Sequence, residues 1–280
     1  MATIQILKKK LRSIRSTQKI TKAMQTASTA KFAKLNGRMA HYRSYCGEYR
    51  RLYEEHREQY STMFSPADPN APCALVVIAA NKGMCGGFNS EVLTLARETI
   101  ENADKPYVIY PCGKKAQAYF DEAHIAYEKS FAFRDVPAYA EAEELFAELC
   151  RGFRSGKISA ITIVYSSYAN ITRQTAKAQD MFAVDISECG SAPALFFPDE
   201  SSVVEKTANQ IMGALMFEKI LESALGAQAA TLMAMRSAHD AATEYAVELE
   251  REINRSRQKQ VTADVIETSV ECVEEENLNG

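Results

Sequence analysis

Proline is missing from both ends of this sequence, and tryptophan is missing altogether. None of the eight prolines in the 280-residue chain lies before residue 66 or after residue 198. Because a proline inside a helix removes a backbone hydrogen bond and clashes with the preceding turn, proline-free stretches of this length favour long helices. The pattern predicts two long helices flanking a compact central domain, with domains at 1–65, 66–198 and 199–280.

Negative charge is missing from the start of the chain. The first carboxylate is Glu48, so residues 1–47 carry 11 Lys and Arg residues and no Asp or Glu. Residues 1–65 have a net charge of +10, whereas residues 199–280 have a net charge of −9. The overall charge of −3 therefore hides a basic start and an acidic end, which favours pairing of the two terminal helices.

Long apolar runs, paired cysteines and histidine clusters are also missing. No stretch of about 18 apolar residues is present, so a membrane-spanning helix is not expected. The N-terminus lacks the apolar segment of a signal peptide. The seven cysteines form no CxxC pair and the four histidines are scattered, so no metal site is expected. Reduced thiols of a cytosolic protein are the simpler interpretation.

The N-terminal segment has apolar residues at alternating spacings of three and four, which is the seam of a coiled coil. The apolar seam residues are Ile4, Leu7, Leu11, Ile14, Phe32, Leu35, Met39, Tyr42, Cys46, Tyr49 and Tyr53. Between the two groups the seam positions are polar, namely Gln18, Thr21, Gln25 and Ser28. Two interpretations stay open: a helix that changes its buried face and partner midway, or a polar layer that fixes register.

The C-terminal segment keeps the same spacing with smaller residues. Its seam includes Leu225, Met235, His239, Ala242, Ala246 and Leu249. Small seam residues let two helices approach closely, so the sequence predicts an antiparallel coiled coil between the two ends. Because His239 has no second ligand nearby, we expect a packed or half-exposed side chain rather than a catalytic or metal-binding one.

The middle of the chain alternates apolar runs with helical patterns. Strands are expected at 73–80, 107–112, 125–131 and 158–165, helices at 88–103, from 113 onward and at 138–153, and a polar ribbon at 170–187. Such alternation predicts βαβ units and a mostly parallel sheet.

A glycine-rich turn at 81–87 joins the first of these strands to a helix, as in many phosphate-binding sites. It lacks both the GxGxxG and the GxxxxGK[ST] spacing. A tight turn that packs a helix closely on its strand is therefore the favoured interpretation. No Ser/His/Asp or paired-carboxylate constellation is evident, so the sequence does not predict a catalyst.

Three motifs resemble the gamma subunit of F-type ATP synthase. The segment Ser16–Met24 (STQKITKAM) resembles the family's N-terminal helix motif, and Asn254–Thr262 (NRSRQKQVT) resembles its C-terminal helix motif. The 81–87 turn resembles the family's DRGLCGG segment, with Asn81, Lys82 and Met84 substituted. The resemblance covers essentially the whole chain in the right order.

The resemblance implies an α/β fold with long helices: an antiparallel coiled coil of the N- and C-terminal helices plus a central Rossmann-like domain. It implies a rotor shaft inside a ring of three alpha and three beta subunits, with the central domain against the epsilon subunit and the ring of c subunits. Such a shaft couples ion translocation to ATP synthesis or hydrolysis, has no catalytic residues and needs no cofactor. The implied location is peripheral, at the cytoplasmic face of a bacterial membrane.

Residues that match the family's ring-facing positions form the candidate site, again as the resemblance implies. They are Lys19, Ile20, Lys22 and Met24 on the N-terminal helix, and Arg257, Gln258, Thr262 and Glu267 on the C-terminal helix. The chain departs from the family at Thr231, where a basic residue is usual, and at Asp264, Glu271 and Cys272. The residues at 274–280 are acidic, where the family's tail is apolar.

Two alternatives stay open from the sequence alone. A nucleic-acid-binding protein would use the basic N-terminal helix to follow phosphates, and would be retained on DNA in a salt-dependent way. A dinucleotide-dependent α/β enzyme would use the central domain, and would show saturable nucleotide binding by the isolated chain.

Overall fold

The computed structural model describes residues 2–55, 66, 68–181 and 200–278, which fall into two compact units. Unit 1 is built from residues 1–26 and 235–280, and unit 2 from residues 27–234. Two long helices, α1 (Ala2–Glu55) and α6 (Glu200–Leu278), contribute to both units. The domain boundaries expected after residues 65 and 198 fall beside or within segments outside the described residues, and they stay predictions.

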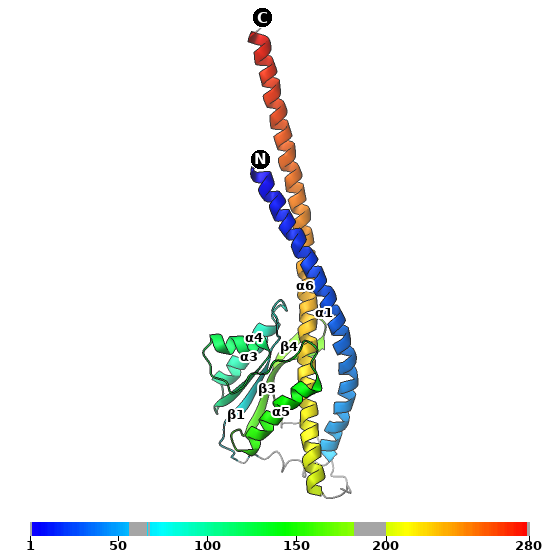
Figure 1. Cartoon of the computed structure of the whole chain (residues 1–280), viewed down its shortest axis with the longest axis vertical. Coiled ribbons are helices and arrows are strands. Elements are labelled where there is room, and N and C mark those ends of the chain that lie inside the picture. Colours follow the sequence, from blue (N-terminus) through cyan, green and yellow to red (C-terminus); the bar gives the residue numbers. More distant parts are fainter. Residues whose placement is uncertain (1, 56–65, 67, 182–199, 279–280) are drawn as a thin grey trace. The chain divides into compact units, whose positions relative to one another are not determined.

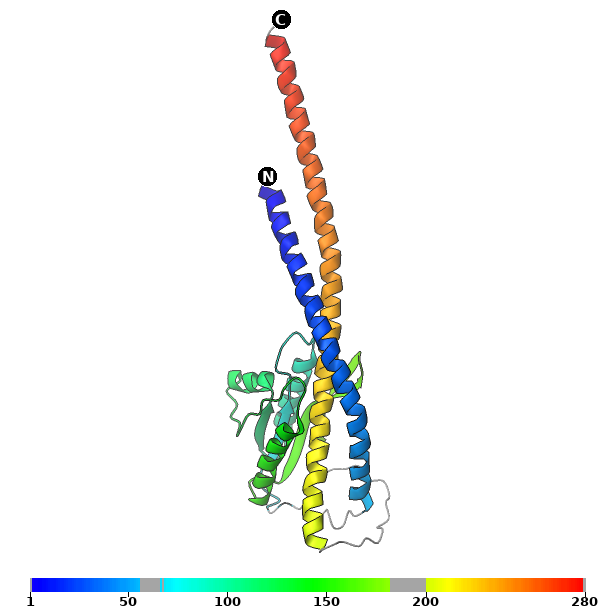
Figure 2. The same cartoon turned by 45° about the vertical axis from the view of Figure 1, so that its right-hand side comes forward.

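Unit 1 is an antiparallel pair of helices, as the seam patterns predict. Arg15 pairs with Glu250, Gln18 contacts Thr243, and Thr21 contacts His239, so residue numbers rise on one helix as they fall on the other. The core between the helices includes Leu7, Met235, Ala242, Ala246 and Leu249, all buried. In Figures 1 and 2 the end of α6 continues past the N-terminus of α1.

The seam of α1 stays covered where its residues are polar. Thr21 and Ser28 are buried, and Gln18 and Gln25 are partly buried. Ile20, which lies off the seam, is 56% exposed. Within the chain, this burial agrees with the polar-layer interpretation. A second partner for the exposed apolar residues stays a prediction.

Unit 2 contains a four-stranded sheet in the order β2-β1-β3-β4. Its strands are β1 (Cys73–Ile78), β2 (Tyr107–Cys112), β3 (Ala160–Asn170) and β4 (Arg173–Asp180). β1 is parallel to both β2 and β3, and β4 joins the edge antiparallel to β3. The predicted mostly parallel sheet is confirmed. Within the polar ribbon expected at 170–187, residues 173–180 form β4, whose side chains are largely exposed, which explains its weak apolar signal. Residues 182–187 lie outside the described residues.

Helices cover both faces of this sheet (Figure 1). Val76 and Ile78 of β1 pack in a core with α5 (Tyr139–Arg154) and with unit 2 residues of α1 and α6. Leu75 and Val77 point the other way, into a core with α3 (Phe88–Glu101) and α4 (Lys114–Glu122). Burial on both faces explains the continuous apolar run of β1.

The strand expected at 125–131 is wrong. This segment forms only an isolated bridge between Phe131 and Cys112. The Phe131 N–H donates to the Pro111 carbonyl at 2.8 Å, and its own carbonyl accepts from the Gly113 N–H at 2.7 Å. Four residues later, Asp135 pairs with Lys31 of α1 at 2.5 Å.

Ion pairs join α1 and α6 inside unit 2. Arg50 binds Glu218, whose side chain is only 5% exposed. Arg43 lies 4.0 Å from Glu222, and the Glu222 carboxylate also accepts hydrogen bonds from Ser167 Oγ and the Tyr168 N–H at 2.9 Å each. These carboxylates fix α6 against both α1 and β3.

Tyr42 offers a test of this packing. Its ring meets Phe217 edge to face with centroids 5.0 Å apart, and its buried hydroxyl has no hydrogen-bond partner among the described residues. Burial raises the pKa of Tyr42 well above its ordinary value. We expect Tyr42→Phe to keep or raise the free energy of unfolding, by up to about 1 kcal/mol, because it removes an unsatisfied polar group.

Urea unfolding of the full chain measures this effect. Tyr49→Phe is the matched control, since the Tyr49 hydroxyl lies 2.8 Å from the Tyr45 hydroxyl and would lose that hydrogen bond. A larger destabilisation by Tyr42→Phe than by Tyr49→Phe would contradict the packing described.

Candidate functional site

The N-terminal half of the candidate site lies on the outside of α1 in unit 1. Lys19, Ile20 and Lys22 are exposed, and Met24 is partly buried. They alternate with the covered seam positions of the polar layer. The seam thus faces α6, while positive and apolar side chains face outward from the same two turns.

The polar layer is joined by hydrogen bonds across the helix pair. His239 Nδ1 lies 3.2 Å from the Gln18 carbonyl and 3.5 Å from Thr21 Oγ1. A carbonyl only accepts, so Nδ1 carries the hydrogen that binds Gln18. Gln18 Nε2 donates to Thr243 Oγ1 at 3.0 Å. His239 is therefore a packed, partly buried residue, as expected, and its bonds fix the register of the pair.

Removing the imidazole should weaken unit 1. We expect His239→Ala to lower the free energy of unfolding by about 1 kcal/mol, because the bond to the covered Gln18 carbonyl is lost. Urea unfolding measures the change, with Ser237→Ala at an exposed position of the same helix as the control. Equal stability of the two variants would show that the layer contributes nothing.

The C-terminal half of the candidate site lies farther along α6. Arg257, Gln258 and Thr262 are exposed, and Thr262 Oγ1 donates to the Gln258 carbonyl at 2.9 Å. Glu267 lies in α6, but its side chain is outside the described residues, as are those of Glu271 and Cys272 and the 274–280 tail.

An apolar row next to this group was missed by the sequence reasoning. Val261, Val265 and Ile266 are 55%, 62% and 58% exposed. They lie toward the C-terminal end of α6. The same three-and-four spacing continues from Leu249 through Ile253, Ser256 and Gln260 to Ala263. The detectable signal is that Val261 and Val265, four residues apart, lie off this seam.

The structure does not bring the two halves of the site together. Thr21 faces His239, and Arg257 lies 18 positions beyond His239, which is about 27 Å along the helix. Unit 1 therefore carries two separate outward surfaces, one around Lys19–Met24 and one around Arg257–Thr262.

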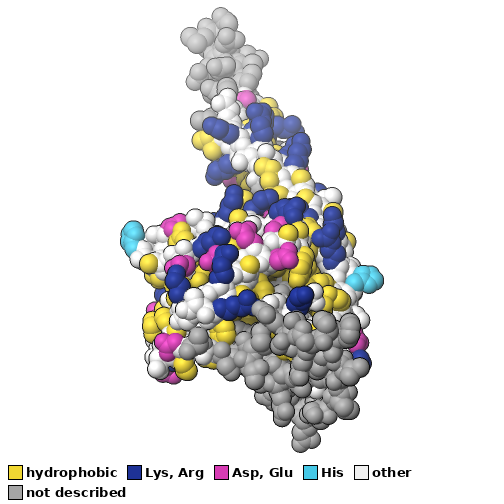
Figure 3. All heavy atoms as spheres, turned by 60° about the horizontal axis from the view of Figure 1, so that its bottom comes forward, with side chains coloured by type: hydrophobic (Ala, Val, Ile, Leu, Met, Phe, Trp, Pro, Cys, Tyr) yellow, Lys and Arg dark blue, Asp and Glu magenta, His cyan; other side chains and the backbone are white. Residues whose placement is uncertain are grey.

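Opposite charges cover the two helices of unit 1. Lys8, Lys9, Lys10 and Arg12 of α1 are exposed, and Figure 3 shows Lys and Arg side chains along this unit below its grey tip. On α6, Asp240, Glu244 and Glu248 are also exposed. Arg15 and Glu250 form an ion pair at 2.6 Å. Exposed pairs contribute little stability, so the Arg15–Glu250 pair adds little to the association of the two helices.

Comparison with known proteins identifies the family. The family model described as ATP synthase matches residues 3–269. The chain belongs to the ATP synthase gamma-chain family. It is 29% identical to the ATP synthase gamma chain of Leptospira biflexa over 95% of this chain and 97% of that protein. It is 26% identical to the gamma chain of Rubrobacter xylanophilus over 95% and 96%.

Solved structures show the same fold. A chain in the mitochondrial ATP synthase of Euglena gracilis, in a structure of its OSCP, F1 and c-ring, matches with a TM-score of 0.66 at 16% identity, over 95% of this chain and 92% of that one. A chain in the central stalk and c-ring of the Tetrahymena thermophila enzyme matches with a TM-score of 0.62 at 19% identity, over 78% and 99%.

The glycine-rich turn of this family member is held closed by hydrogen bonds with the side chain of Asn89, which lies in α3. Asn89 Oδ1 accepts from the Ala80 N–H at 2.9 Å, and Asn89 Nδ2 donates to the Lys82 carbonyl at 3.2 Å. Gly86 has a φ of +58°, which glycine adopts without strain. The turn packs α3 against the end of β1, in agreement with the tight-turn interpretation.

Thr231, at the position where the resemblance implies a basic residue, lies in unit 2. It is partly buried, and its hydroxyl donates to the Ala227 carbonyl at 2.7 Å. The side chain is thus bound to its own helix.

Asp135 connects three segments of unit 2. It pairs with Lys31 of α1 at 2.5 Å and with Lys82 of the turn at 3.5 Å. Burial alone would raise the pKa of this carboxyl, but the hydrogen bonds and charges of Lys31 and Lys82 outweigh it and lower the pKa.

The lowered pKa predicts a pH-dependent loss of stability. The ion pairs contribute fully above the ordinary pKa of aspartate, about 3.9, and the contribution is lost as the pH falls through the lowered value. We expect Asp135→Asn to be less stable than the parent at pH 7 and the difference to shrink toward pH 3. Thermal unfolding against pH measures it, with the exposed Asp104→Asn as control. A constant difference would contradict the assignment.

Among the described residues, groups of three or more His, Cys, Asp and Glu side chains suited to a metal ion do not occur. Likewise, none of the described helices combines the length and the apolarity that a bilayer crossing requires.

Proposed function

We propose that this chain is the central rotor shaft of an F-type ATP synthase, a subunit without catalytic residues of its own. The observation that carries the proposal is the family match across residues 3–269. The antiparallel helix pair of unit 1 supports it, because the pair presents different side chains on its different sides. A shaft that differs around its circumference is what a rotary coupling needs.

The shaft acts as a ligand that binds three ring conformations unequally. A ring of three alpha and three beta subunits surrounds it, and each beta site meets a different side of the shaft. Turning the shaft moves the bias from one site to the next, which changes their affinities in sequence. Ion flow through the c ring thereby drives ATP synthesis, or ATP hydrolysis drives ion flow.

Each outward surface of unit 1 has its own part in this contact. Lys19 and Lys22 attract acidic segments of the ring, and Ile20 and Met24 add apolar contact beside them. Arg257, Gln258, Thr262 and Glu267 face the ring farther along α6. Exposed Val261 and Val265 lie among these residues and add apolar area to the same contact.

The remaining partners contact the sheet-containing unit. Unit 2 lies against the epsilon subunit and the ring of c subunits. The protein is thus a peripheral member of a membrane-associated complex, at the cytoplasmic face of a bacterial membrane. Family membership supports this placement, since relatives named ATP synthase gamma chain come from bacteria such as Leptospira biflexa.

Co-expression with alpha and beta subunits tests the function. We expect a stable complex on size-exclusion chromatography and an ATPase activity that depends on this chain. Lys19→Ala combined with Ile20→Ala should weaken coupling, whereas Arg97→Ala, at an exposed position of α3, should not. If a complex with alpha and beta does not form, the rotor-shaft proposal fails.

The exposed basic side chains of α1 also suit nucleic-acid binding, the second candidate. Chromatography of the purified chain on immobilised duplex DNA separates the two functions. Salt-dependent retention above about 150 mM would favour nucleic-acid binding, and free passage at that salt would exclude it.

A further inference from the structure

The topology of the sheet marks one place in unit 2 as a ligand crevice. In the strand order β2-β1-β3, the chain forms β2 on one side of β1 and then crosses to form β3 on its other side. The point beside β1 where the side of addition changes is the switch point of the sheet. In open α/β sheets, ligands bind outside the carboxyl ends of the strands at such a switch point. Here the carboxyl end of β1 is Ile78.

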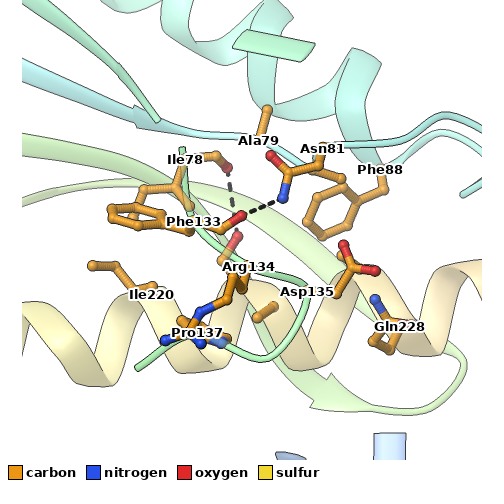
Figure 4. A pocket seen from close by; sticks show the side chains of 14 residues that line it. Ile78, Ala79, Asn81, Phe88, Phe133, Arg134, Asp135, Pro137, Ile220 and Gln228 are labelled. Carbon is orange, nitrogen blue, oxygen red and sulfur yellow. Dashed lines mark hydrogen bonds between the residues drawn. The ribbon is translucent and has the colours of Figure 1, made fainter. Parts of the chain in front are cut away.

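A small apolar pocket lies at this end of β1. Its volume is about 40 Å³, and its apolar lining includes Ile78, Phe88, Phe133, Ile220, Ala224 and Ala227. Figure 4 shows Ile220 and Gln228 of α6 facing Phe133, Phe88 and Asn81. The pocket has room for a few water-sized groups, which suits the edge of a flat ring between two aromatic side chains.

A larger basic cavity adjoins the apolar pocket. The cavity has a volume of about 740 Å³ and shares Asn81, Phe133, Arg134 and Asp135 with the pocket. Its one lining carboxylate is Asp135. Six cationic side chains line it, namely Lys31, Lys34, Arg38, Lys82, Lys114 and Arg134. Such a size lies within the usual range for small-molecule sites.

Positive charge in the cavity exceeds what the protein neutralises. Lys31 and Lys82 share Asp135, and Arg134 pairs with Glu141 at 2.5 Å. Lys34, Arg38 and Lys114 are exposed. The cavity thus carries a surplus of cations, which suits a multiply charged anion such as a phosphate group better than a single carboxylate.

We propose that unit 2 binds a small aromatic phosphate at this place. The ring edge enters the apolar pocket beside Phe88 and Phe133, and the phosphate lies among the cations of the basic cavity. The ligand would bridge α1, the loop at 132–138 and α6, because all three line the two spaces. Its binding would stiffen unit 2 and requires no bond to be made or broken.

Isothermal titration of the full chain with adenosine monophosphate tests the proposal. We expect saturable binding that is tighter than that of inorganic phosphate and that weakens as salt rises. Lys34→Gln combined with Arg38→Gln should weaken it at least about tenfold, because two charged contacts are lost. Lys10→Gln, at an exposed position of unit 1, should leave it unchanged.

A second variant separates the ring site from the phosphate site. Ala224→Met fills the apolar pocket, so it should weaken the nucleotide and leave inorganic phosphate unaffected. Circular dichroism checks that each variant is folded. Three results would each overturn the proposal: no saturable binding, equal affinity for the nucleotide and for phosphate, or unchanged affinity in the Lys34/Arg38 variant.

Discussion

Met24→Lys is expected to lower ATP-driven ion pumping by a factor at least about five times larger than the factor by which it lowers ATP hydrolysis. A fivefold difference corresponds to a change of about 1 kcal/mol in the coupling free energy. Met24 is partly buried on α1, beside the covered positions Thr21 and Gln25. A lysine there extends its ammonium group to solvent while its methylenes stay packed. The substitution therefore adds charge at the outward surface without breaking the seam.

The added charge acts on the contact with the ring. It stands near Lys19 and Lys22, which are already exposed, so it changes the attraction of this one side of the shaft for acidic segments of the ring. The bias that the shaft imposes on each beta site in turn is thereby altered. Assembly should be unchanged.

Met24→Leu is the matched control, because it keeps volume and apolarity while adding no charge. Hydrolysis and pumping are measured on the reconstituted complex in sealed vesicles. A strictly parallel fall of both activities in Met24→Lys would contradict the account, since it would indicate lost assembly instead of lost coupling.

Arg50→Ala is expected to lower the free energy of unfolding by about 3 kcal/mol, the largest stability effect among these variants. Glu218, its partner, has a side chain that is only 5% exposed. Without the guanidinium group, the carboxylate keeps its desolvation cost and loses its main ion pair. The cost of an unpaired buried charge exceeds that of a lost surface contact.

Two variants make this result specific. Arg51→Ala changes a neighbouring side chain that is 67% exposed and pairs with Glu48 and Glu55 on its own helix, so it should alter stability by less than about 0.5 kcal/mol. Arg50→Met combined with Glu218→Met should recover most of the loss, because both charges are removed. Urea unfolding that shows equal effects of Arg50→Ala and Arg51→Ala would contradict the buried pair.

The helices and the parallel strands were predictable from local patterns. Proline-free ends and the spacing of Leu7, Leu35 and Leu249 indicate the helix pair, and the apolar run after Pro72 indicates β1. Phe131 was mistaken for part of a strand because an apolar residue that forms one bridge and a residue in a full ladder look alike in sequence. The ion pair between Lys31 and Asp135 joins residues 104 positions apart, so local sequence patterns do not reveal it.

The site was predictable only in part. Motifs assign Lys19 to the N-terminal helix and Arg257 to the C-terminal helix, and the structure shows both exposed, while their contact with a ring stays a prediction. Sequence spacing left open whether the polar seam positions were buried, since the answer depends on His239, more than 200 residues away, reaching Gln18. The exposed apolar residues around Val261 depend on the length of α6 relative to α1. No local pattern in the sequence of α6 reveals that difference in length.

Rotation of this chain within the complex is the most direct test of its role. A biotin-acceptor peptide inserted after the exposed Asp104 of unit 2 would carry a bead, with the alpha and beta subunits fixed to a surface. We predict rotation in one direction during ATP hydrolysis, in three steps per turn to match three beta sites. ATP hydrolysis by the bead-labelled complex with the bead stationary would contradict the central claim.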